Sequence, residues 1–261
     1  MKKSLSIIMT VMSINAYAVD TSTGPNSVYI QQVGSSNVIT IEQVGGTNRV
    51  GGITNTTSTT VDGTGITTLT PAAPSTSNYG TITGSTNTLD VTQHGNNNST
   101  QYNIQGGHNA YTSTVTGSNN QTTLTVGDTN HSSNNYNTIS ETIIGNTNMV
   151  ITNIVGGNNT LTSTVTGNTN QITQNVNTTN ASITNTATGN NNVFNFQQVD
   201  TAGANGHVLV AATVGDYNSI STQQQGTNDT TLNINTSGNH NTITIRSSSG
   251  TIVNPVSAIA R

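Results

Sequence analysis

The stretch LDVTQHGNNN, residues 89–98, combines an alternating apolar pattern with a turn rich in Gly and Asn. Leu89, Val91 and Gln93 occupy every second position, which is the periodicity of a β-strand. Gly95 and Asn98 follow, and both residue types tolerate the positive φ angles of tight turns. The stretch therefore predicts a short strand that ends in a tight turn.

The same unit recurs along the chain, and most neighbouring copies of its Gly-x-x-Asn turn are 11 residues apart. About sixteen copies can be aligned when degenerate ones are included. The turn positions that set the alignment most clearly are Gly34, Asn37, Gly45, Asn48, Gly95, Asn98, Gly106, Asn109, Gly117, Asn120, Gly156, Asn159, Gly167 and Asn170. A period this short and this regular is typical of a solenoid.

Equal strands joined by equal turns can stack in register. Two units form one layer of 22 residues, and layers stack at the ~4.8 Å spacing of hydrogen-bonded strands. We therefore predict an all-β protein, a β-solenoid of about sixteen short strands in two stacked parallel sheets. The residues expected to form inward ladders are Val28, Ile30, Gln32, Ile39, Ile41, Gln43, Leu89, Val91, Gln93, Val115, Ile154, Val165 and Gln224.

Composition excludes several other classes of protein. Charged residues make up 5% of the chain, against about 25% in typical globular domains. The chain has no Cys, which excludes disulfides and thiolate metal sites. Its net charge of −4 argues against nucleic acid as a partner, because nucleic-acid binding needs clustered Lys and Arg. Asn/Gln-rich, low-charge composition is instead typical of β-prone chains.

The N-terminus has the pattern of a secretory signal peptide over residues 1–18. Lys2 and Lys3 precede a short apolar run, and the small residues Ala16 and Ala18 suit a cleavage site. That run is too short for a permanent membrane span, and no longer one follows. Cleavage after Ala18 would leave three arginines against nine acidic residues, a net charge of −6. We expect a secreted protein.

The repeats divide the remaining chain into five parts. Residues 19–26 form a short N-terminal segment and residues 27–48 the first pair of repeats. Residues 49–77 break the register and are expected to be an irregular layer, a bulging loop or a linker between two blocks. Residues 78–245 form the main solenoid, with a smaller insertion at 131–137, and residues 246–261 form a tail that has room for one last strand.

The units at 27–37, 38–48 and 89–98 resemble curlin repeats, the repeats of the subunits of curli. Gln32, Gln43, Gln93 and Gln224 match the Gln of that pattern, and the Gly and Asn pairs match its turn. The resemblance implies a functional amyloid of the bacterial cell surface that supports adhesion and the biofilm matrix. It also implies export through an outer-membrane secretion pore and polymerisation on a fibre nucleator.

A solenoid has two open ends with unpaired backbone groups, which soluble repeat proteins cover with polar caps. No shift in composition marks a capping domain here, and the repeats carry little charge. We therefore expect the ends to be the active surface, where one copy of the chain templates the next. Isolated acids such as Glu42, Asp90, Asp128 and Asp216 are either solvated surface residues or gatekeepers that slow premature stacking.

Residues that could carry catalysis or bind a cofactor do not form a convincing set. The five histidines, His94, His108, His131, His207 and His240, do not recur at one register, so shared metal binding is not expected. The sequence VDGTG at 61–65 is similar to an aspartic-protease motif, but it lacks a second copy and suits a plain turn. We expect no enzyme activity, no cofactor and no metal.

Threonine suggests one alternative. Positions between the inward residues read Thr112, Thr114, Thr116, Thr162, Thr164, Thr166, Thr184, Thr186 and Thr188. All nine belong to alternate units, so they are expected on one face of the solenoid, although threonine is also simply a good strand former. Flat Thr arrays resemble those of ice-binding proteins. The alternatives to a fibre subunit are therefore a Thr-rich ice-binding protein or a monomeric surface adhesin.

Overall fold

The computed structural model describes residues 12–19, 26–51, 80–127, 135–177, 179–199, 208–225, 231–247 and 254–259. These residues form a sheet of 10 strands and a sheet of 11 strands, in which every pairing is parallel. The chain alternates between the sheets, so the fold is the β-solenoid that the repeats predict. No described segment is a helix with the length and hydropathy to cross a membrane.

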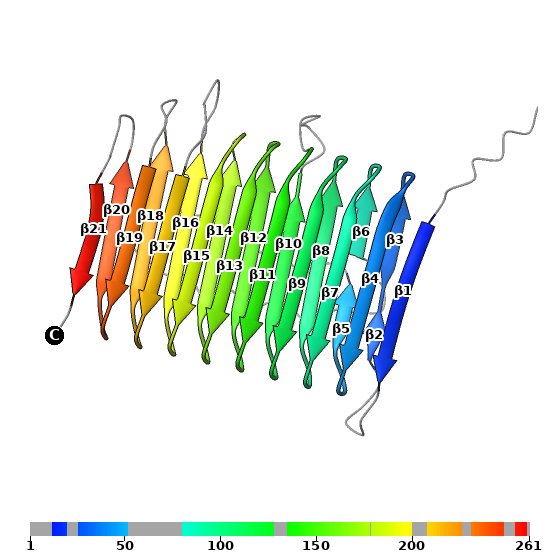
Figure 1. The fold of residues 1–261 in the computed structure, drawn as a ribbon, viewed down its shortest axis with the longest axis horizontal. Helices are drawn as coiled ribbons and strands as arrows, with labels where there is room; N and C mark the ends of the chain where they lie inside the picture. The colour runs from blue at the N-terminus through cyan, green and yellow to red at the C-terminus, as the bar shows by residue number, and fades with distance from the viewer. Residues whose placement is uncertain are drawn as a thin grey trace, which may run out of the picture.

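The first sheet, sheet A, is in front in Figure 1, and its strands run in sequence order from one end of the molecule to the other. Its strands are β1 (Met12–Val19), β4 (Asn37–Val44), β7 (Thr88–His94), β9 (Ala110–Thr116), β11 (Thr138–Ile144), β13 (Thr160–Thr166), β15 (Ser182–Thr188), β17 (Val208–Val214), β19 (Thr231–Ser237) and β21 (Asn254–Ile259).

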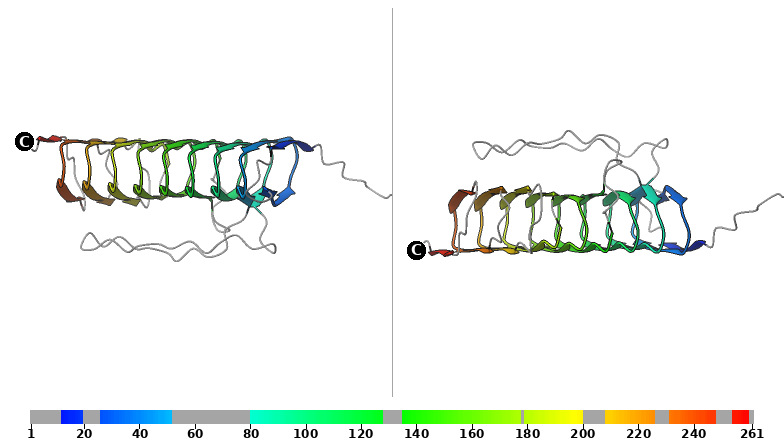
Figure 2. Two further views of the ribbon diagram at one scale, coloured as in Figure 1. Left: turned by 90° about the horizontal axis from the view of Figure 1, so that it is seen from below. Right: turned by 90° about the horizontal axis from the view of Figure 1, so that it is seen from above.

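The second sheet, sheet B, lies behind sheet A, and Figure 2 shows the two sheets edge-on as parallel layers. Its strands are β2 (Ser27–Val28), β3 (Ile30–Val33), β5 (Arg49–Gly51), β6 (Gly80–Thr83), β8 (Ser99–Gln105), β10 (Gln121–Val126), β12 (Met149–Val155), β14 (Gln171–Asn177), β16 (Val193–Val199), β18 (Ser219–Gln225) and β20 (Thr242–Ser247).

The register places equivalent residues of successive layers beside one another. Leu161 of β13 lies between Ile139 of β11 and Ile183 of β15, each 22 residues away. Alternate residues of each strand point inward, and Ile139, Leu161 and Ile183 are all at most 2% exposed. The apolar core therefore consists of columns that run along the solenoid axis, as the period of two predicts.

Most of the tight turns begin with glycine, and where glycines of successive layers stack the geometry requires it. Gly145 has φ +128°, and a Cβ built on it would lie 1.8 Å from the carbonyl oxygen of Gly167 in the next layer. The third turn residue adopts the left-handed conformation even when it is not glycine, as Thr147 does with φ 58°. The turns thus stack so closely that no side chain fits at the glycine position.

The Asn that closes an inner turn is buried and bonds to the layers on both sides. The side chain of Asn148 donates to Asn120 Oδ1 at 3.1 Å and to the carbonyl oxygen of Gly167 at 2.7 Å. Its own Oδ1 accepts from the backbone N–H of Asn170 at 2.9 Å. Because a buried amide needs all its partners, this ladder of Asn side chains fixes the stacking of the turns.

The larger break in the repeat, which follows Gly51, interrupts one strand of sheet B and does not separate two layers. β5 ends at Gly51 and β6 begins at Gly80, yet both pair with β8, the former through Arg49–Gly51 and the latter through Thr81–Thr83. Three residues expected in the insertion, Arg49–Gly51, therefore form a strand, and residues 52–79 lie outside the described residues. β4 pairs directly with β7, which excludes two separate solenoid blocks.

The strands outnumber the expected sixteen for identifiable reasons. The strand position interrupted after Gly51 is divided into β5 and β6, and β2 and β3 are likewise separated by Tyr29. β1, β20 and β21 are not followed by a Gly-x-x-Asn turn, so the repeat alignment did not count them, although β21 is a last strand within the tail at 246–261. At the smaller insertion the ladder position belongs to Asn137, since its Nδ2 donates to Asn109 Oδ1 at 3.0 Å. Asn130, which the alignment had favoured there, lies outside the described residues.

We predict that Gly145→Ala lowers the free energy of unfolding by well over 1 kcal/mol, because its Cβ has no space and its φ is unfavourable. The matched control, Thr147→Asn in the same turn, should leave stability unchanged or higher, since Asn tolerates the left-handed conformation better than Thr. Urea unfolding of the freshly diluted monomer, followed by circular dichroism, would measure both. Equal stability of the two variants would contradict the stacked-turn geometry.

Candidate functional site

In the described part of the chain, both ends of the solenoid present strands that have a neighbour on one side only. At the N-terminal end, β2 pairs only with β5 and β3 pairs only with β6. At the C-terminal end, β20 pairs only with β18 and β21 pairs only with β19. These edge strands are the candidate functional site, because each exposes one row of backbone donors and acceptors.

In a parallel sheet, successive residues of a strand direct their backbone N–H and C=O groups alternately to the two neighbouring strands. This alternation identifies which backbone groups of an edge strand lack a partner. Val38 and Gly95 show the rule, since the N–H of Val38 donates to Asn87 in the following layer and the N–H of Gly95 to Val44 in the preceding one. Outward-facing residues thus bond toward the C-terminal end and inward-facing residues toward the N-terminal end. The free groups are those of Val28 and Ile30 at one end and of Thr242 and Thr244 at the other.

Charged residues and Pro, which discourage further pairing at exposed strand edges, are sparse in these strands. β2 and β3 contain no charged residue and no Pro, and β20 contains no Pro. Pro255 does lie in β21, paired opposite Asn233, where the alternation directs its missing N–H toward the open end. The C-terminal edge of sheet A therefore lacks one donor, whereas the edge of sheet B in β20 keeps all of its donors.

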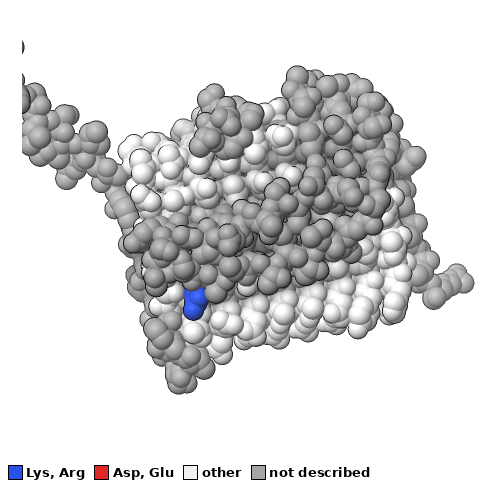
Figure 3. Space-filling view, turned by 180° about the vertical axis from the view of Figure 1, so that it is seen from behind, with Lys and Arg blue, Asp and Glu red and all other residues white. Residues whose placement is uncertain are grey.

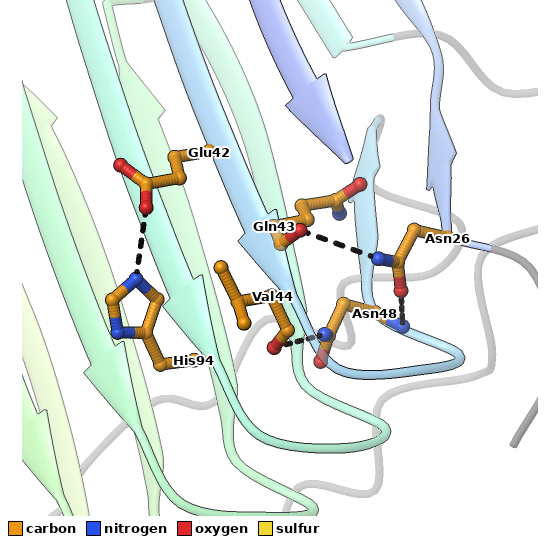
Figure 4. A network of polar contacts seen from close by, with 6 residues as sticks. All are labelled: Asn26, Glu42, Gln43, Val44, Asn48 and His94. Carbon is orange, nitrogen blue, oxygen red and sulfur yellow. Dashed lines mark hydrogen bonds and ion pairs between the residues drawn. The ribbon is translucent and has the colours of Figure 1, made fainter. Parts of the chain in front are cut away.

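The Asn ladder is also open at both ends. Figure 4 shows its first member, Asn26, which donates to the carbonyl oxygen of Gln43 and accepts from the backbone N–H of Asn48. At the other end, Asn241 donates to Asn218 Oδ1 at 3.0 Å and to the carbonyl oxygen of Ser237 at 3.3 Å. A further layer added at the C-terminal end would give Asn241 the partners that inner Asn residues have.

Gln32 marks the N-terminal end of the core with unused hydrogen-bonding capacity. Both polar atoms of its amide are buried, and neither has a partner among the described residues. The column it belongs to is apolar in the middle of the molecule, through Ile82, Ile104, Val126 and Ile154. The positions of that column near the C-terminal end are again polar: Gln198, Gln224 and Ser247.

The inner ladder of Gln continues in sheet A. Gln43 Nε2 donates to Gln93 Oε1 at 2.9 Å, and Gln93 Nε2 donates to Thr100 Oγ1 at 3.0 Å across the core. Both glutamines are at most 1% exposed. Gln93 and Val115 share one inward column, so amide and apolar side chains follow one another in the same interior.

A second polar group lies in the middle of the core around Glu141, whose carboxyl group is 1% exposed. Tyr111 donates its hydroxyl to Glu141 Oε2 at 2.9 Å, and Thr152 donates to Oε1 at 2.6 Å. Burial raises the pKa of Glu141 to about 7, although both hydrogen bonds act in the opposite direction. Burial, together with the nearby carboxyl group, also raises the pKa of Tyr111 well above its usual value. The core therefore favours a protonated Glu141.

The residues expected in the inward ladders are placed as follows. Ile39, Ile41, Gln43, Leu89, Val91, Gln93, Val115, Ile154 and Val165 are at most 1% exposed. Val28 and Ile30, in the terminal layer, are partly buried against the same core. The side chain of Gln224 lies outside the described residues, although its backbone keeps the ladder register.

The turn residues separate into two stacks, one at each edge of the sheets. Gly45, Gly95, Gly117 and Gly167 belong to one glycine stack, and Gly34 and Gly106 to the other. Each Asn follows its glycine: Asn48, Asn98, Asn120 and Asn170 form one ladder, and Asn37, Asn109 and Asn159 the other. Gly156 accepts from Asn137 in the second stack. That ladder is interrupted at Ala181, which has no side-chain amide.

The three described histidines each have a partner of their own. His94 Nε2 lies 3.2 Å from Glu42 Oε1 on the exposed surface (Figure 4), while His108 stacks on Tyr136 and His240 on Tyr217. No group of three or more potential metal ligands occurs within the described part of the chain. His131, His207 and the VDGTG segment at 61–65 lie outside it.

Charge is sparse on the surface. Seen from behind, on the side of sheet B, Figure 3 shows a single basic patch and no acidic side chain among the described residues. Of the acids considered as gatekeepers, Glu42 is half-exposed in its ion pair with His94, and Asp216 accepts a hydrogen bond from the backbone N–H of Asn190. Asp90 is partly buried, and Asp128 lies outside the described residues.

Searches of protein-family models, curated proteins and solved structures found no match to this chain.

We predict that the folded monomer loses stability as the pH rises from about 4.5 to about 7. Glu141 ionises at a lower pH in the unfolded chain than in the folded core, so its contribution is complete below 4.5 and lost above 7. The loss amounts to about 3 kcal/mol. Glu141→Gln should remove this dependence and make the protein more stable than wild type at pH 8. Urea unfolding at pH 4 to 8 would measure it, with Glu42→Gln on the surface as the control that keeps the wild-type profile.

Proposed function

We propose that the chain is a structural subunit of an extracellular, curli-like amyloid fibre that supports adhesion and the biofilm matrix. Copies of the chain join end to end, so that both sheets continue from one copy into the next. The observation that carries this proposal is the pair of unpaired edges on otherwise continuous, in-register sheets. No catalytic step is involved, because the assembled backbone ladder is itself the product.

In such a junction, polar residues at the two ends of the solenoid would lie where they can form hydrogen bonds with one another. A copy placed beyond β20 would bring Gln32 next to Ser247 in the same register column. The backbone N–H of Asn26 would then lie above Asn241 Oδ1, which is the contact that every inner pair of the Asn ladder makes. Each junction would therefore satisfy buried amide groups that the single chain leaves unpaired.

The strand β1 supports a link between export and assembly. β1 pairs with the whole length of β4, from Met12 beside Asn37 to Val19 beside Val44. All but its last residue belong to the expected signal peptide, so cleavage after Ala18 removes β1 and frees the edge of β4. In a fibre, that edge is where β21 of the preceding copy would pair. The chain would thus carry its own block until it is exported.

A secretion pore and a fibre nucleator are the other partners proposed, by resemblance to curlin. The edge of β2 and β3 begins at Ser27, nine residues after Ala18, the last residue before the proposed cleavage site. A nucleator with the same repeat would present an edge like that of β20, and the first copy would add to it as later copies add to one another.

The test of the proposal is seeded growth of the chain that begins at Val19. Incubated at neutral pH, it should form fibres after a lag that preformed seeds abolish, with a meridional reflection near 4.8 Å in fibre diffraction. A chain that stays monomeric for weeks at high concentration, with or without seeds, would refute the proposal and favour a monomeric adhesin.

We predict that Thr244→Pro in β20 slows seeded elongation by roughly tenfold, the effect of about 1.4 kcal/mol at the junction. Proline removes an N–H that faces the open end and so disturbs no hydrogen bond within the chain. Thr244→Val keeps the N–H and should elongate at the wild-type rate. Dye-binding kinetics on wild-type seeds would measure all three, and equal rates for the Pro and Val variants would exclude β20 as a growing edge.

We also predict that the full chain of 261 residues nucleates more slowly than the chain from Val19, because β1 occupies the edge of β4. The difference should disappear when Ser13→Pro, Asn15→Pro and Tyr17→Pro are combined in the full chain, since these residues pair opposite Val38, Thr40 and Glu42 and the alternation directs their N–H groups toward β4. Equal lag times for the unsubstituted full chain and the chain from Val19 would show that β1 does not act as a block.

A further inference from the structure

The outward face of sheet A carries a nearly pure array of threonine. β9, β11, β13 and β15 contribute every second residue, starting at Ala110, Thr138, Thr160 and Ser182, and these strands supply three, two, four and three threonines in turn. Two serines, Ala110 and Ile144 complete the set. We call this surface the threonine face.

The strand register converts the threonine face into a two-dimensional lattice. Thr114, Thr142, Thr164 and Thr186 stand directly beside one another in four successive strands. Along each strand the next outward residue follows two positions on. The array therefore repeats at about 4.8 Å across the strands and about 6.7 Å along them.

The threonine face is flat, exposed and uncharged. Figure 2 shows sheet A edge-on as an almost straight line along its whole length. Every outward residue of the four strands is exposed or only partly buried, and none is charged or aromatic. Glu141, the single acid in these strands, points into the core.

The threonine face ends at a change of chemistry on both sides. The next strand toward the C-terminal end, β17, presents Val208, Val210, Ala212 and Val214. The next strand on the other side, β7, presents Asp90 and His94 among two threonines. The array is thus confined to four successive strands of sheet A.

We propose that the threonine face binds ice, a function separate from fibre assembly. Each threonine offers one hydroxyl group, which donates and accepts hydrogen bonds, and one methyl group, which restricts the orientation of nearby water. Water molecules held at a fixed lattice of such groups are ordered in two dimensions. The repeat across the strands is close to the shortest lattice repeat of hexagonal ice, so the held layer can merge with a growing crystal face.

A water lattice fits this surface better than a macromolecule does. Protein-binding surfaces are enriched in aromatic residues, Met and Arg, all of which are absent from the outward positions of these four strands. The face also has no pocket-forming large side chain beside a small one in its central columns. The face offers a strictly repeated array of small side chains, and a crystal is the kind of partner whose own lattice repeat can match it.

The experiment measures thermal hysteresis and inhibition of ice recrystallisation by the full chain. Wild type should hold ice crystals at constant size within a measurable freezing gap and shape them into facets. Thr164→Tyr places a large ring at the centre of the lattice and should lower the hysteresis roughly tenfold, because it prevents close approach of the crystal. Thr164→Lys, which remains soluble on a surface, should do the same and serves as the second variant should the tyrosine chain fold poorly.

Asn177→Tyr is the matched control, since it adds the same ring to an exposed position of β14 in sheet B. It should keep wild-type hysteresis, and all three variants should keep the wild-type circular dichroism and seeded growth rate. Absence of hysteresis and of recrystallisation inhibition in wild type would overturn the inference, as would equal losses in Thr164→Tyr and Asn177→Tyr. Fibre growth is scored separately, so failure of the proposed fibre function would leave the ice result distinguishable.

Discussion

The structure depends on identical turns that stack without lateral shift. The glycine carbonyl oxygen of one layer lies where a Cβ of the preceding layer would be, and the closing Asn bonds to the layers above and below. A shift of one residue in any strand would turn its core side chains outward and separate the Asn amides. Sequence repetition is therefore the physical condition for closing a core that contains so few large apolar residues.

The same constraint explains why polar side chains are abundant in the core. In a globular fold a buried Gln needs a partner of specific shape, whereas here the equivalent residue of the next layer lies directly beside it and can serve as that partner. Gln43 with Gln93 and Thr100 with Thr122 bond in this way along the axis. Glu141 is the exception, because Ser113 and Ser163 flank it in its column and its partners come from Tyr111 and from Thr152 across the core. Polarity is harmless in this core as long as a neighbouring layer supplies the complement.

Much of the fold could be predicted from the sequence because the strands have a strict period of two and the turns a fixed spacing. The inward position of Glu141 follows from the alternation between Ile139 and Ile143, yet its partner Tyr111 lies 30 residues away and depends on the layer register. The free donors of Thr242 and Thr244 depend on β20, which lacks the turn signature that defines the other units. The pairing of β1 with β4 was not predicted, because apolar residues near an N-terminus were interpreted as a signal peptide.

The interruption between Gly51 and Gly80 has a consequence for how such chains diversify. The strand resumes beside β8 in unchanged register, and the Tyr29 backbone bonds to residues on both sides of the break, to Val50 and to Gly80. A foreign peptide could therefore be spliced into the middle of a rung at no cost to the flanking ladder. In a polymer of this subunit, any such graft would be displayed once per copy at regular intervals, which makes the site a natural attachment point for cargo.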